Sequence, residues 1–421
     1  MDILNHSSHL NNKGYSTSED NLTEPRHRWY YFKEGFSTNL VDYAISESGL
    51  KSDDIILDPF GGSGTVNLCA SQKGIDSIGI EVNPFAFFLS KVKHLNPSLR
   101  YLEGKIKKDI SIITKGIIKG KKSPFLNFST FSELTGKEKW LFNSDVLNSF
   151  EGGYNELKKI NPAYRNLFKL ALINSAMANC NAKKDGKCLR YRTNWEKLDF
   201  DSEDILKSFE KNIEVIIEDL IKDAIIVQPK IYNADSRNFL NENKLQFKLC
   251  ITSPPYLNSF DYTDVYRPEL FLGRFIKTQE SLYDLRKQTL CSHINVLKKL
   301  CNFKSDSLLY NKVLAQLNDH RKEFWNGNIP LMVQLYFQQM NNILKRLFIL
   351  GKKGTQTWMV VANSAYFNFE IPTDLILADL GTKVGWKLKE IHVLREVFKR
   401  GSKYSPDVHS LRESAVVFYK P

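Results

Sequence analysis

The sequence has little of what marks a secreted, membrane-spanning or zinc-binding protein. Its six cysteines include no Cys-x-x-Cys pair, and its eight histidines show no ligand spacing around them, which predicts reduced thiols and no metal site. No apolar stretch reaches the roughly 18 residues of a membrane span, and the polar segment from Met1 to Asn21 has no apolar core of the signal-peptide type. We therefore expect a cytoplasmic protein without a membrane partner.

Positive charge is what the chain has in excess. Its 421 residues carry 59 Lys and Arg against 47 Asp and Glu, a formal net charge of +12. Such a surplus favours a polyanionic partner, because Lys and Arg bind phosphates by displacing condensed counterions. Charge alone does not select nucleic acid, since many basic proteins of this size bind no polyanion. A hydrophobic fraction of 42% predicts a folded core.

Six segments differ in composition along the chain. They are a flexible N-terminal arm (1–24), a first sheet part with a cofactor site (25–98), a charged, helical insertion (99–223), a second sheet part with a catalytic motif (224–260), a second helical insertion (261–329) and a closing sheet part (330–421). Apolar runs predict strands at 54–57, 77–80, 224–232 and 247–252, and a closing pair at 386–393 and 414–419. The order of elements predicts an α/β fold with a Rossmann-like, doubly wound, mostly parallel sheet and a terminal antiparallel hairpin, interrupted by the helical insertions.

A glycine-rich turn, Asp58-Pro59-Phe60-Gly61-Gly62-Ser63-Gly64-Thr65, follows the first of these strands. It places backbone N–H groups at the start of a helix, where a ligand can approach closely. A dinucleotide fingerprint would need a third glycine at position 67, which is Asn67, so a pyrophosphate ligand is disfavoured. Asp58, at the strand tip, suits a cationic amino group. Many α/β folds use such a turn simply to change direction.

Acidic residues end two further strands. Glu81 lies where such folds place a carboxylate on the ribose hydroxyls of a nucleotide-like cofactor, although it could be a solvated strand-end acid. Asn83 follows it and would shape the turn beside the adenine ring of such a cofactor. Asp235 follows the strand predicted at 224–232 and suits a hydrogen bond to the adenine amino group, with a helix N-cap as the competing role.

The tetrapeptide Ser253-Pro254-Pro255-Tyr256 follows the strand at 247–252. Exocyclic amines of nucleobases are poor nucleophiles because their lone pair is delocalised into the ring. Acceptors such as Ser253 Oγ and the carbonyl of Pro254 can localise that pair by binding the amine protons, and the prolines fix the backbone so that this carbonyl faces the site. The Tyr256 ring offers a face on which an extruded base can stack. The alternative is a rigid Pro-Pro turn with a surface tyrosine.

With these residues in place, the chain resembles the S-adenosylmethionine-dependent amino-methyltransferases of DNA, which methylate N4 of cytosine or N6 of adenine. The resemblance covers the aromatic segment before the first strand, the two motifs, Glu81, Asp235 and the strand at 414–419. It implies S-adenosyl-L-methionine as the cofactor, with Ser253, Pro254, Pro255 and Tyr256 as the catalytic residues. The implied cofactor-binding residues are Phe36, Ser37, Asp58, Pro59, Phe60, Gly61, Gly62, Gly64, Thr65, Glu81, Val82, Asn83, Asp235 and Ser236.

The resemblance also bears on the substrate. The serine form of the tetrapeptide looks more like the cytosine enzymes, which predicts methylation of N4 in double-stranded DNA by base flipping, within a restriction–modification system and beside a cognate endonuclease. The alternatives are an N6-adenine DNA enzyme, an RNA base amino-methyltransferase and a nucleic-acid-binding protein that has lost the chemistry. A nicotinamide oxidoreductase is disfavoured by Asn67.

Basic residues within the first insertion are our candidates for DNA contact. They are Lys183, Lys184, Lys187, Arg190 and Arg192. Such a charge run is as often a solvated loop, and which of the two insertions reads DNA stays open.

Overall fold

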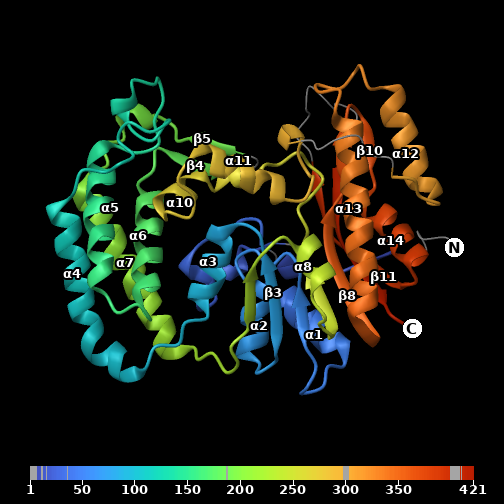
Figure 1. The fold of residues 1–421 in the computed structure, drawn as a ribbon, viewed down its shortest axis with the longest axis horizontal. Coiled ribbons are helices and arrows are strands. Elements are labelled where there is room, and N and C mark those ends of the chain that lie inside the picture. The colour runs from blue at the N-terminus through green and yellow to red at the C-terminus, as the bar shows by residue number, and fades with distance from the viewer. Residues whose placement is uncertain are drawn as a thin grey trace.

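The structure is a computed structural model that describes residues 7–10, 13–15, 17–35, 37–185, 188–296, 303–398, 408 and 410–421. A central sheet carries helices on its faces, and a group of long helices stands beside it (Figure 1). Across these residues no helix combines the length and the apolar character needed to cross a membrane.

Eight strands form the main sheet. They are β1 (Ser7–His9), β2 (Ile56–Asp58), β3 (Ser77–Glu81), β6 (Lys230–Asn233), β7 (Phe247–Thr252), β8 (Gly351–Ala362), β11 (Lys387–Phe398) and β12 (Ser410–Tyr419). Their order in the sheet is β1-β11-β12-β8-β7-β2-β3-β6. The run from β8 to β6 is parallel, and β12 pairs antiparallel with both β8 and β11. The predicted Rossmann-like sheet with a terminal antiparallel hairpin is confirmed.

The strand order fixes where a ligand can bind. The chain runs outward from β2 to β3 and β6, and then returns to place β7 on the other side of β2. The switch in direction therefore lies between β2 and β7. In doubly wound sheets the crevice at the carboxyl ends of two such strands is the usual ligand site.

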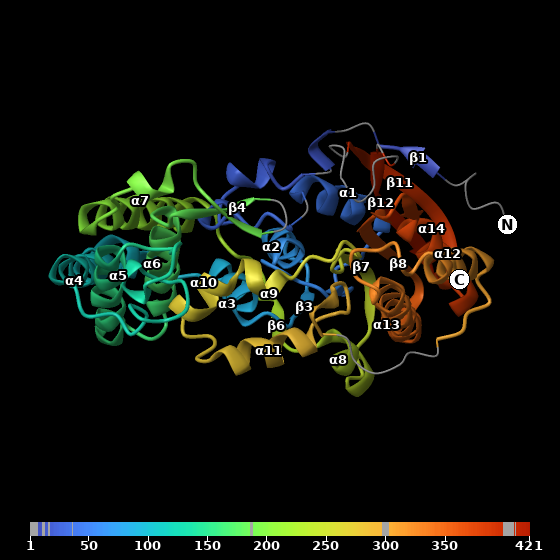
Figure 2. The same cartoon turned by 90° about the horizontal axis from the view of Figure 1, so that it is seen from above.

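Alternating strand residues bury the two faces of the sheet under different helices. Ile56 packs with α1 (Thr38–Ser48) and α2 (Thr65–Gln72), whereas Leu57 belongs to the core beneath α13 (Ile329–Leu350) and α14 (Thr373–Val384). Figure 2 shows α1 and α13 on opposite sides of the sheet. The remaining helices along the sheet are α3 (Pro84–Lys93) and α8 (Ser236–Glu242).

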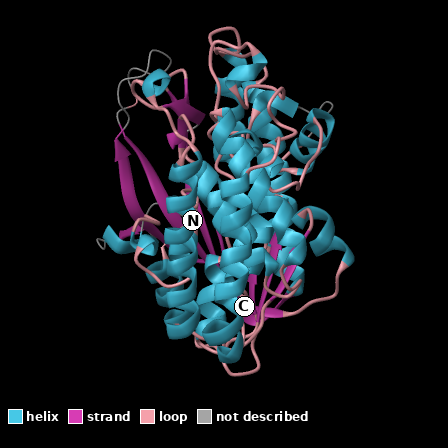
Figure 3. Ribbon diagram, turned by 90° about the vertical axis from the view of Figure 1, so that its left-hand side faces the viewer, coloured by secondary structure: helices cyan, strands magenta, loops and turns pink. Residues whose placement is uncertain are grey.

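The insertions add the other elements. The first holds α4 (Ile106–Lys119), α5 (Ser144–Glu156), α6 (Arg165–Ala178), α7 (Ser202–Lys222) and the hairpin of β4 (Ala182–Asp185) and β5 (Cys188–Tyr191). Its helices stand in front of the sheet in Figure 3 and share one core with α3. The second holds α9 (Tyr262–Val265), α10 (Arg267–Leu272), α11 (Gln279–Gln288) and α12 (Leu308–Asp319). A small hairpin, β9 (Ser364–Tyr366) and β10 (Phe369–Ile371), follows β8.

Short helical turns complete the description. The 3-10 turns are Lys13–Tyr15, Asp20–Leu22, His27–Trp29, Glu133–Thr135, Leu157–Lys159, Trp195–Lys197 and Ile294–Val296, and a π-helical turn spans Tyr101–Lys105.

Three expectations need correction. The arm predicted to be flexible contains β1, which pairs in parallel with β11 and thereby satisfies the backbone groups of that edge strand. The strand predicted at 224–232 begins only at Lys230, because Pro229 before it has no N–H to donate. The insertion at 99–223 is not wholly helical, since its basic segment forms the β4–β5 hairpin.

A clamp on Asp219 joins the first insertion to the sheet. This buried carboxylate on α7 accepts hydrogen bonds from the backbone N–H of Arg26, the guanidinium of Arg28 and the indole N–H of Trp29. Arg26 is itself fully buried and donates to the carbonyl oxygens of Lys93 and Leu95 at the C-terminal end of α3. The segment before Phe32 is therefore held between α7 and α3.

Candidate active site

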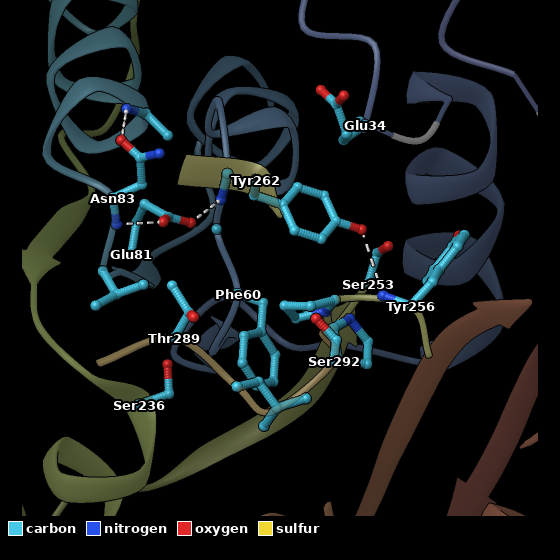
Figure 4. A pocket seen from close by; sticks show the side chains of 18 of the residues that line it. Glu34, Phe60, Glu81, Asn83, Ser236, Ser253, Tyr256, Tyr262, Thr289 and Ser292 are labelled. Atoms are coloured by element: carbon cyan, nitrogen blue, oxygen red, sulfur yellow. Dashed lines mark hydrogen bonds between the residues drawn. The ribbon is translucent and has the colours of Figure 1, made fainter. Parts of the chain in front are cut away.

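A cavity of about 460 Å³ lies at the carboxyl ends of β2, β3 and β7. Most of its lining comes from four parts of the chain: residues 32–35, the glycine-rich turn with residues 80–86, residues 235–237 with 253–266, and residues 288–293 (Figure 4). Arg395 on β11 adds to it. The volume of the cavity suits a small molecule or cofactor. Most predicted site residues line it: Asp58, Pro59, Phe60, Gly61, Gly62, Thr65, Glu81, Val82, Asn83, Asp235, Ser236, Ser253, Pro254, Pro255 and Tyr256.

Two of the predicted cofactor residues that the structure describes do not line this cavity. Gly64 lies behind it, and Ser37 is a buried N-cap of α1 that accepts from Asn39 N–H. Phe36 lies outside the described residues. The neighbouring residues Phe32, Glu34 and Gly35 line the cavity instead.

Asp58 sits at the switch point between β2 and β7. Its Oδ1 accepts hydrogen bonds from Thr252 Oγ1 at 2.8 Å and from Phe60 N–H at 3.0 Å, while Oδ2 receives none from the described residues. Burial raises the pKa of Asp58 to about 7. A cationic group beside Oδ2 would favour the ionised form.

The glycine-rich turn is held against β3. Gly62 adopts a φ of +50°, and its N–H donates to Glu81 Oε2 at 2.8 Å. Gly64, at a φ of +82°, packs so closely on α3 that an added Cβ would lie 2.2 Å from Ser90 Oγ. Both positions therefore require glycine, one for its conformation beside the ligand site and one also for helix packing.

Glu81 is oriented by two backbone donors. Its Oε1 accepts from Asn83 N–H at 2.6 Å and its Oε2 accepts from Gly62 N–H, while Asn83 caps α3 by accepting from Phe85 N–H at 2.9 Å. Burial raises the pKa of Glu81. Each carboxylate oxygen can accept one more hydrogen bond, so Glu81 can bind two neighbouring hydroxyl groups.

Asn67 explains the missing third glycine. Its side chain is buried and donates to Ser77 Oγ at 3.0 Å, so it faces β3 and not the cavity. An added Cβ on Gly79 would lie 2.3 Å from Asn67 Oδ1. Close helix–strand packing is thus achieved by a glycine on the strand instead of the helix.

Asp235 and Ser236 have internal partners at the cavity edge. Asp235 caps α8 through Arg237 N–H and forms an ion pair with the Arg237 guanidinium at 2.6 Å. Ser236 Oγ donates to the carbonyl of Pro59. Arg237 also donates to the carbonyl of Gln288 at 2.9 Å. The structure therefore displays the N-cap role, and Arg237 ties the second insertion to the site, which the sequence pattern did not indicate.

The tetrapeptide after β7 is fixed at its tyrosine. Tyr256 N–H donates to Tyr262 Oη at 3.3 Å, and the Tyr256 hydroxyl donates to Glu413 on β12. Burial, followed by the charge of Glu413, raises the pKa of Tyr256 well above its usual value. Arg395 donates to the other oxygen of Glu413. The ring is held at its far end, and Figure 4 shows the Tyr262 hydroxyl turned toward Ser253 and Tyr256.

An aromatic and charged cluster closes the opposite side. Phe32 stacks on Tyr266 with ring centres 5.0 Å apart, and the Tyr266 hydroxyl donates to Glu34. Lys184 lies 3.8 Å from the centre of the Tyr266 ring and 2.6 Å from the buried carboxylate of Glu269. Burial raises the pKa of Glu34. Tyr262 and Tyr266 were missed in the sequence, because nothing in their spacing links them to the motifs. Glu34 belongs to the aromatic segment before the first strand, which the resemblance included.

The basic segment is mostly used for internal contacts. The ammonium of Lys184 is taken by Glu269, and the guanidinium of Arg192 donates to the carbonyl oxygens of Ala178 and Cys180. The charges of both residues thus help to hold the hairpin against the core, and their contact with DNA stays a prediction. Lys183 and Arg190 are exposed, with Arg190 paired to Asp185 at 2.9 Å. Lys187 lies outside the described residues.

The residues present fit S-adenosylmethionine. Glu81 keeps acceptor capacity for the two ribose hydroxyls, and Asp58 offers Oδ2 to a positive charge. Phe60 and Val82 supply apolar surface beside Glu81 for an adenine ring. A neutral or cationic ligand suits this cavity better than a phosphate, because both of its strand-end groups are carboxylates.

Comparison with known proteins gives one family and several relatives. Residues 4–91 match the model of a DNA methylase family. The type II methyltransferase M.AvaI of Nostoc sp. is 28% identical over 440 residues, covering 95% of this chain and 88% of that protein. M.BsoBI of Geobacillus stearothermophilus, also a type II methyltransferase, is 27% identical over 459 residues, covering 97% and 88%. These matches support an amino-methyltransferase family, as the sequence motifs predicted.

Among solved structures, the rRNA methyltransferase AviRa of Streptomyces viridochromogenes matches with a TM-score of 0.31 and 9% identity over 98% of this chain and 96% of that one. That score is too low to bear on function.

Proposed function

We propose that the chain is a type II DNA methyltransferase of the N4/N6 amino-methyltransferase family and that it methylates the exocyclic N4 of cytosine in duplex DNA. One observation carries the proposal: Ser253–Tyr256 and the Gly62–Glu81 pair line the same cavity at the switch point of the sheet. The serine form of the tetrapeptide supports cytosine over adenine. S-adenosyl-L-methionine, when bound, supplies a methyl group activated by a positively charged sulfur.

Ser253 and Pro254 prepare the amine. Ser253 Oγ and the carbonyl oxygen of Pro254 accept hydrogen bonds from the two N–H groups of the amine. These bonds localise the nitrogen lone pair and stabilise positive charge on the nitrogen during transfer. With the donor bound, the nitrogen would gain a bond to the methyl carbon while the methyl–sulfur bond breaks and leaves its electron pair on sulfur, and the nitrogen would then give up one proton. Neither a serine hydroxyl nor an amide carbonyl is basic at neutral pH, so this proton passes to solvent water.

The other walls hold the cofactor and the base. Glu81 binds the ribose hydroxyls, Asp58 attracts the positively charged end and the glycine-rich turn lets the ligand approach the backbone. A target base reaches Ser253 only after it leaves the duplex, and the Tyr256 ring, anchored on Glu413, provides its stacking surface.

The biological setting follows from the relatives. M.AvaI and M.BsoBI carry the name type II methyltransferase, which supports a role in a restriction–modification system. There the chain would protect chromosomal DNA from a cognate endonuclease, and a chromosomal substrate agrees with the predicted cytoplasmic location.

Nucleoside analysis tests the proposal. The chain and its Ser253→Ala variant are expressed in a host without DNA methylation, and genomic DNA is digested and separated by mass. We expect N4-methylcytosine with the wild type and none with the variant, and sequencing of the same DNA gives the recognition site. Detection of N6-methyladenine in place of N4-methylcytosine would identify adenine, and not cytosine, as the target base. Label transferred to RNA, with none in duplex DNA, would overturn the DNA substrate.

A further inference from the structure

Tyr262 approaches the catalytic tetrapeptide from the second insertion. Its position is fixed from both sides: Asp261 caps α9 by accepting from Thr263 N–H and pairs with Arg286 at 2.8 Å, while Phe260 packs edge-on against the Tyr262 ring at 4.4 Å. Figure 4 shows the hydroxyl beside Ser253 on the cavity wall. A side chain held in this way can be part of the substrate site without moving.

The hydroxyl of Tyr262 has a defined hydrogen-bonding direction. Its oxygen accepts the N–H of Tyr256 at 3.3 Å, so one lone pair is used and the hydroxyl hydrogen must point elsewhere. Within the described ranges no acceptor binds that hydrogen. Burial raises the pKa of Tyr262, so the hydrogen is present at neutral pH. The site therefore offers one unused donor next to the two acceptors of Ser253 and Pro254.

This arrangement matches one edge of two bases. When Ser253 and Pro254 accept the amine protons, the next atom on the Watson–Crick edge is a ring nitrogen with a free lone pair, N3 in cytosine and N1 in adenine. Thymine and guanine present the opposite order there, a carbonyl oxygen followed by an N–H. With thymine or guanine in the site, the donor of the Tyr262 hydroxyl would face the donor of the ring N–H. Both would stay unpaired, which is costly in a buried site.

Resting on the proposed function, we propose that the Tyr262 hydroxyl donates a hydrogen bond to the ring nitrogen adjacent to the methylated amine and so selects amino-bearing bases. Its contribution is to recognition, because withdrawing electrons from the ring nitrogen does not make the amine a better nucleophile. A neutral hydrogen bond of this kind corresponds to roughly a three- to tenfold change in affinity.

The test pairs a protein change with a base change. Once sequencing has given the recognition site, duplexes carry either the ordinary target base or its deaza analogue, 3-deazacytosine or 1-deazaadenine, in which C–H replaces the ring nitrogen. Wild type and Tyr262→Phe are compared on both by the initial rate of tritium transfer at varied DNA concentration. On the ordinary duplex we expect kcat/KM of the variant to fall about three- to tenfold, mainly through KM.

The deaza duplex makes the test specific. On the deaza duplex we expect kcat/KM of the wild type to fall at least as much as that of the variant falls on the ordinary duplex. Tyr262→Phe should show the same kcat/KM on both duplexes, because both changes remove the same hydrogen bond. If the variant were slower than the wild type by the same factor on both duplexes, the proposal would be overturned, and Tyr262 would only support the Tyr256 backbone. No loss on either duplex would also overturn it.

Two controls keep the outcomes separate. Tyr283→Phe, on an exposed tyrosine of α11, should match the wild type in every assay, and thermal unfolding of Tyr262→Phe checks that its fold is intact. If the wild type transfers no label to the ordinary duplex, the proposed function has failed. If the wild type transfers label to the ordinary duplex but Tyr262→Phe is slower than it by the same factor on both duplexes, only the assignment of Tyr262 has failed.

Discussion

The part of the cavity that we assign to the cofactor (the cofactor half) is assembled mainly from neighbouring parts of the chain, whereas the part that we assign to the target base (the target-base half) is assembled from distant ones. In the cofactor half (residues 58–65 and 81–83), Gly62 and Glu81 bond across 19 positions. In the target-base half (Glu34, residues 253–256, Tyr262 and Tyr266), Tyr256 bonds Glu413 across 157 positions and Tyr266 bonds Glu34 across 232. One strand–turn–helix–strand unit supplies most of the first half, to which β7 adds the Thr252 hydroxyl that binds Asp58 across 194 positions. The second half needs the whole fold and both insertions.

This difference has an energetic side. The cofactor half relies mainly on backbone donors and carboxylates held by β2, β3 and α2, with one buried side-chain bond from Thr252 on β7 to Asp58. The target-base half relies on buried side-chain pairs, and loss of one partner leaves the other unpaired in a low-dielectric interior. Changes to the second half should therefore affect stability and base handling while leaving the affinity for S-adenosylmethionine largely intact.

The largest effect is expected from Lys184→Met. Lys184 lies 2.6 Å from Glu269, whose carboxylate is fully buried, so the variant leaves a buried charge without its partner and should lose about 3–5 kcal/mol of unfolding free energy. Urea titration measures it. Lys183→Met is the matched control, because the neighbouring side chain is exposed and should change stability by less than about 0.5 kcal/mol. Equal losses in the two variants would contradict the internal role of Lys184.

Ser253→Ala should separate the two halves most sharply. Removing one acceptor of the amine protons should lower kcat about 10²–10³-fold, by analogy with the loss of one preorganised hydrogen-bonding group in other active sites. Because no hydrogen bond joins Ser253 to the described residues 58–65 or 81–83, the dissociation constant for S-adenosylmethionine, measured by calorimetry, should stay within about twofold. A parallel loss of cofactor affinity would show that the halves are not independent.

A smaller effect is expected from pH. The raised pKa of Asp58, about 7, means that its carboxyl is largely neutral at pH 6 and ionised at pH 8. Only the ionised form attracts a cation, so affinity for S-adenosylmethionine should rise about tenfold between these values. Folding has the opposite sign: ionising this buried group costs stability, which falls as pH rises through 7. The Asp58→Asn variant should bind S-adenosylmethionine weakly, with an affinity that does not change with pH. If the variant kept the pH dependence of the wild type, a group other than Asp58 would be responsible for it.

The cofactor half was also the more predictable one. Glycines at 62 and 64 and the acid at 81 follow apolar runs, and strand periodicity together with the topology rules places such residues at one sheet edge. Asn67 was correctly taken as a departure from a dinucleotide fingerprint, but its packing on Gly79 could not be foreseen, because helix–strand distance depends on both partners. Asp235 was left between two roles, and only the position of Arg237 displayed its capping bond.

The basic segment was harder to interpret. Lys184 and Arg192 have the same charge as Lys183, and sequence cannot tell a cation that meets a buried carboxylate or a helix-end carbonyl from one that faces solvent. The partners lie on other elements, so their distance along the chain hides the contact.

The sequence by itself determined the parts whose geometry is local: the glycine-rich turn, the strand-end acids, the rigid Ser-Pro-Pro-Tyr turn and the resemblance to amino-methyltransferases that these carry. Only the tertiary structure decided which side chains face them. It brought Tyr262, Glu34 and Tyr266 to the cavity and turned Lys184 inward. The physical reason is that backbone conformation depends mainly on near neighbours, whereas the partner of a buried polar group depends on how the sheet and both insertions pack together.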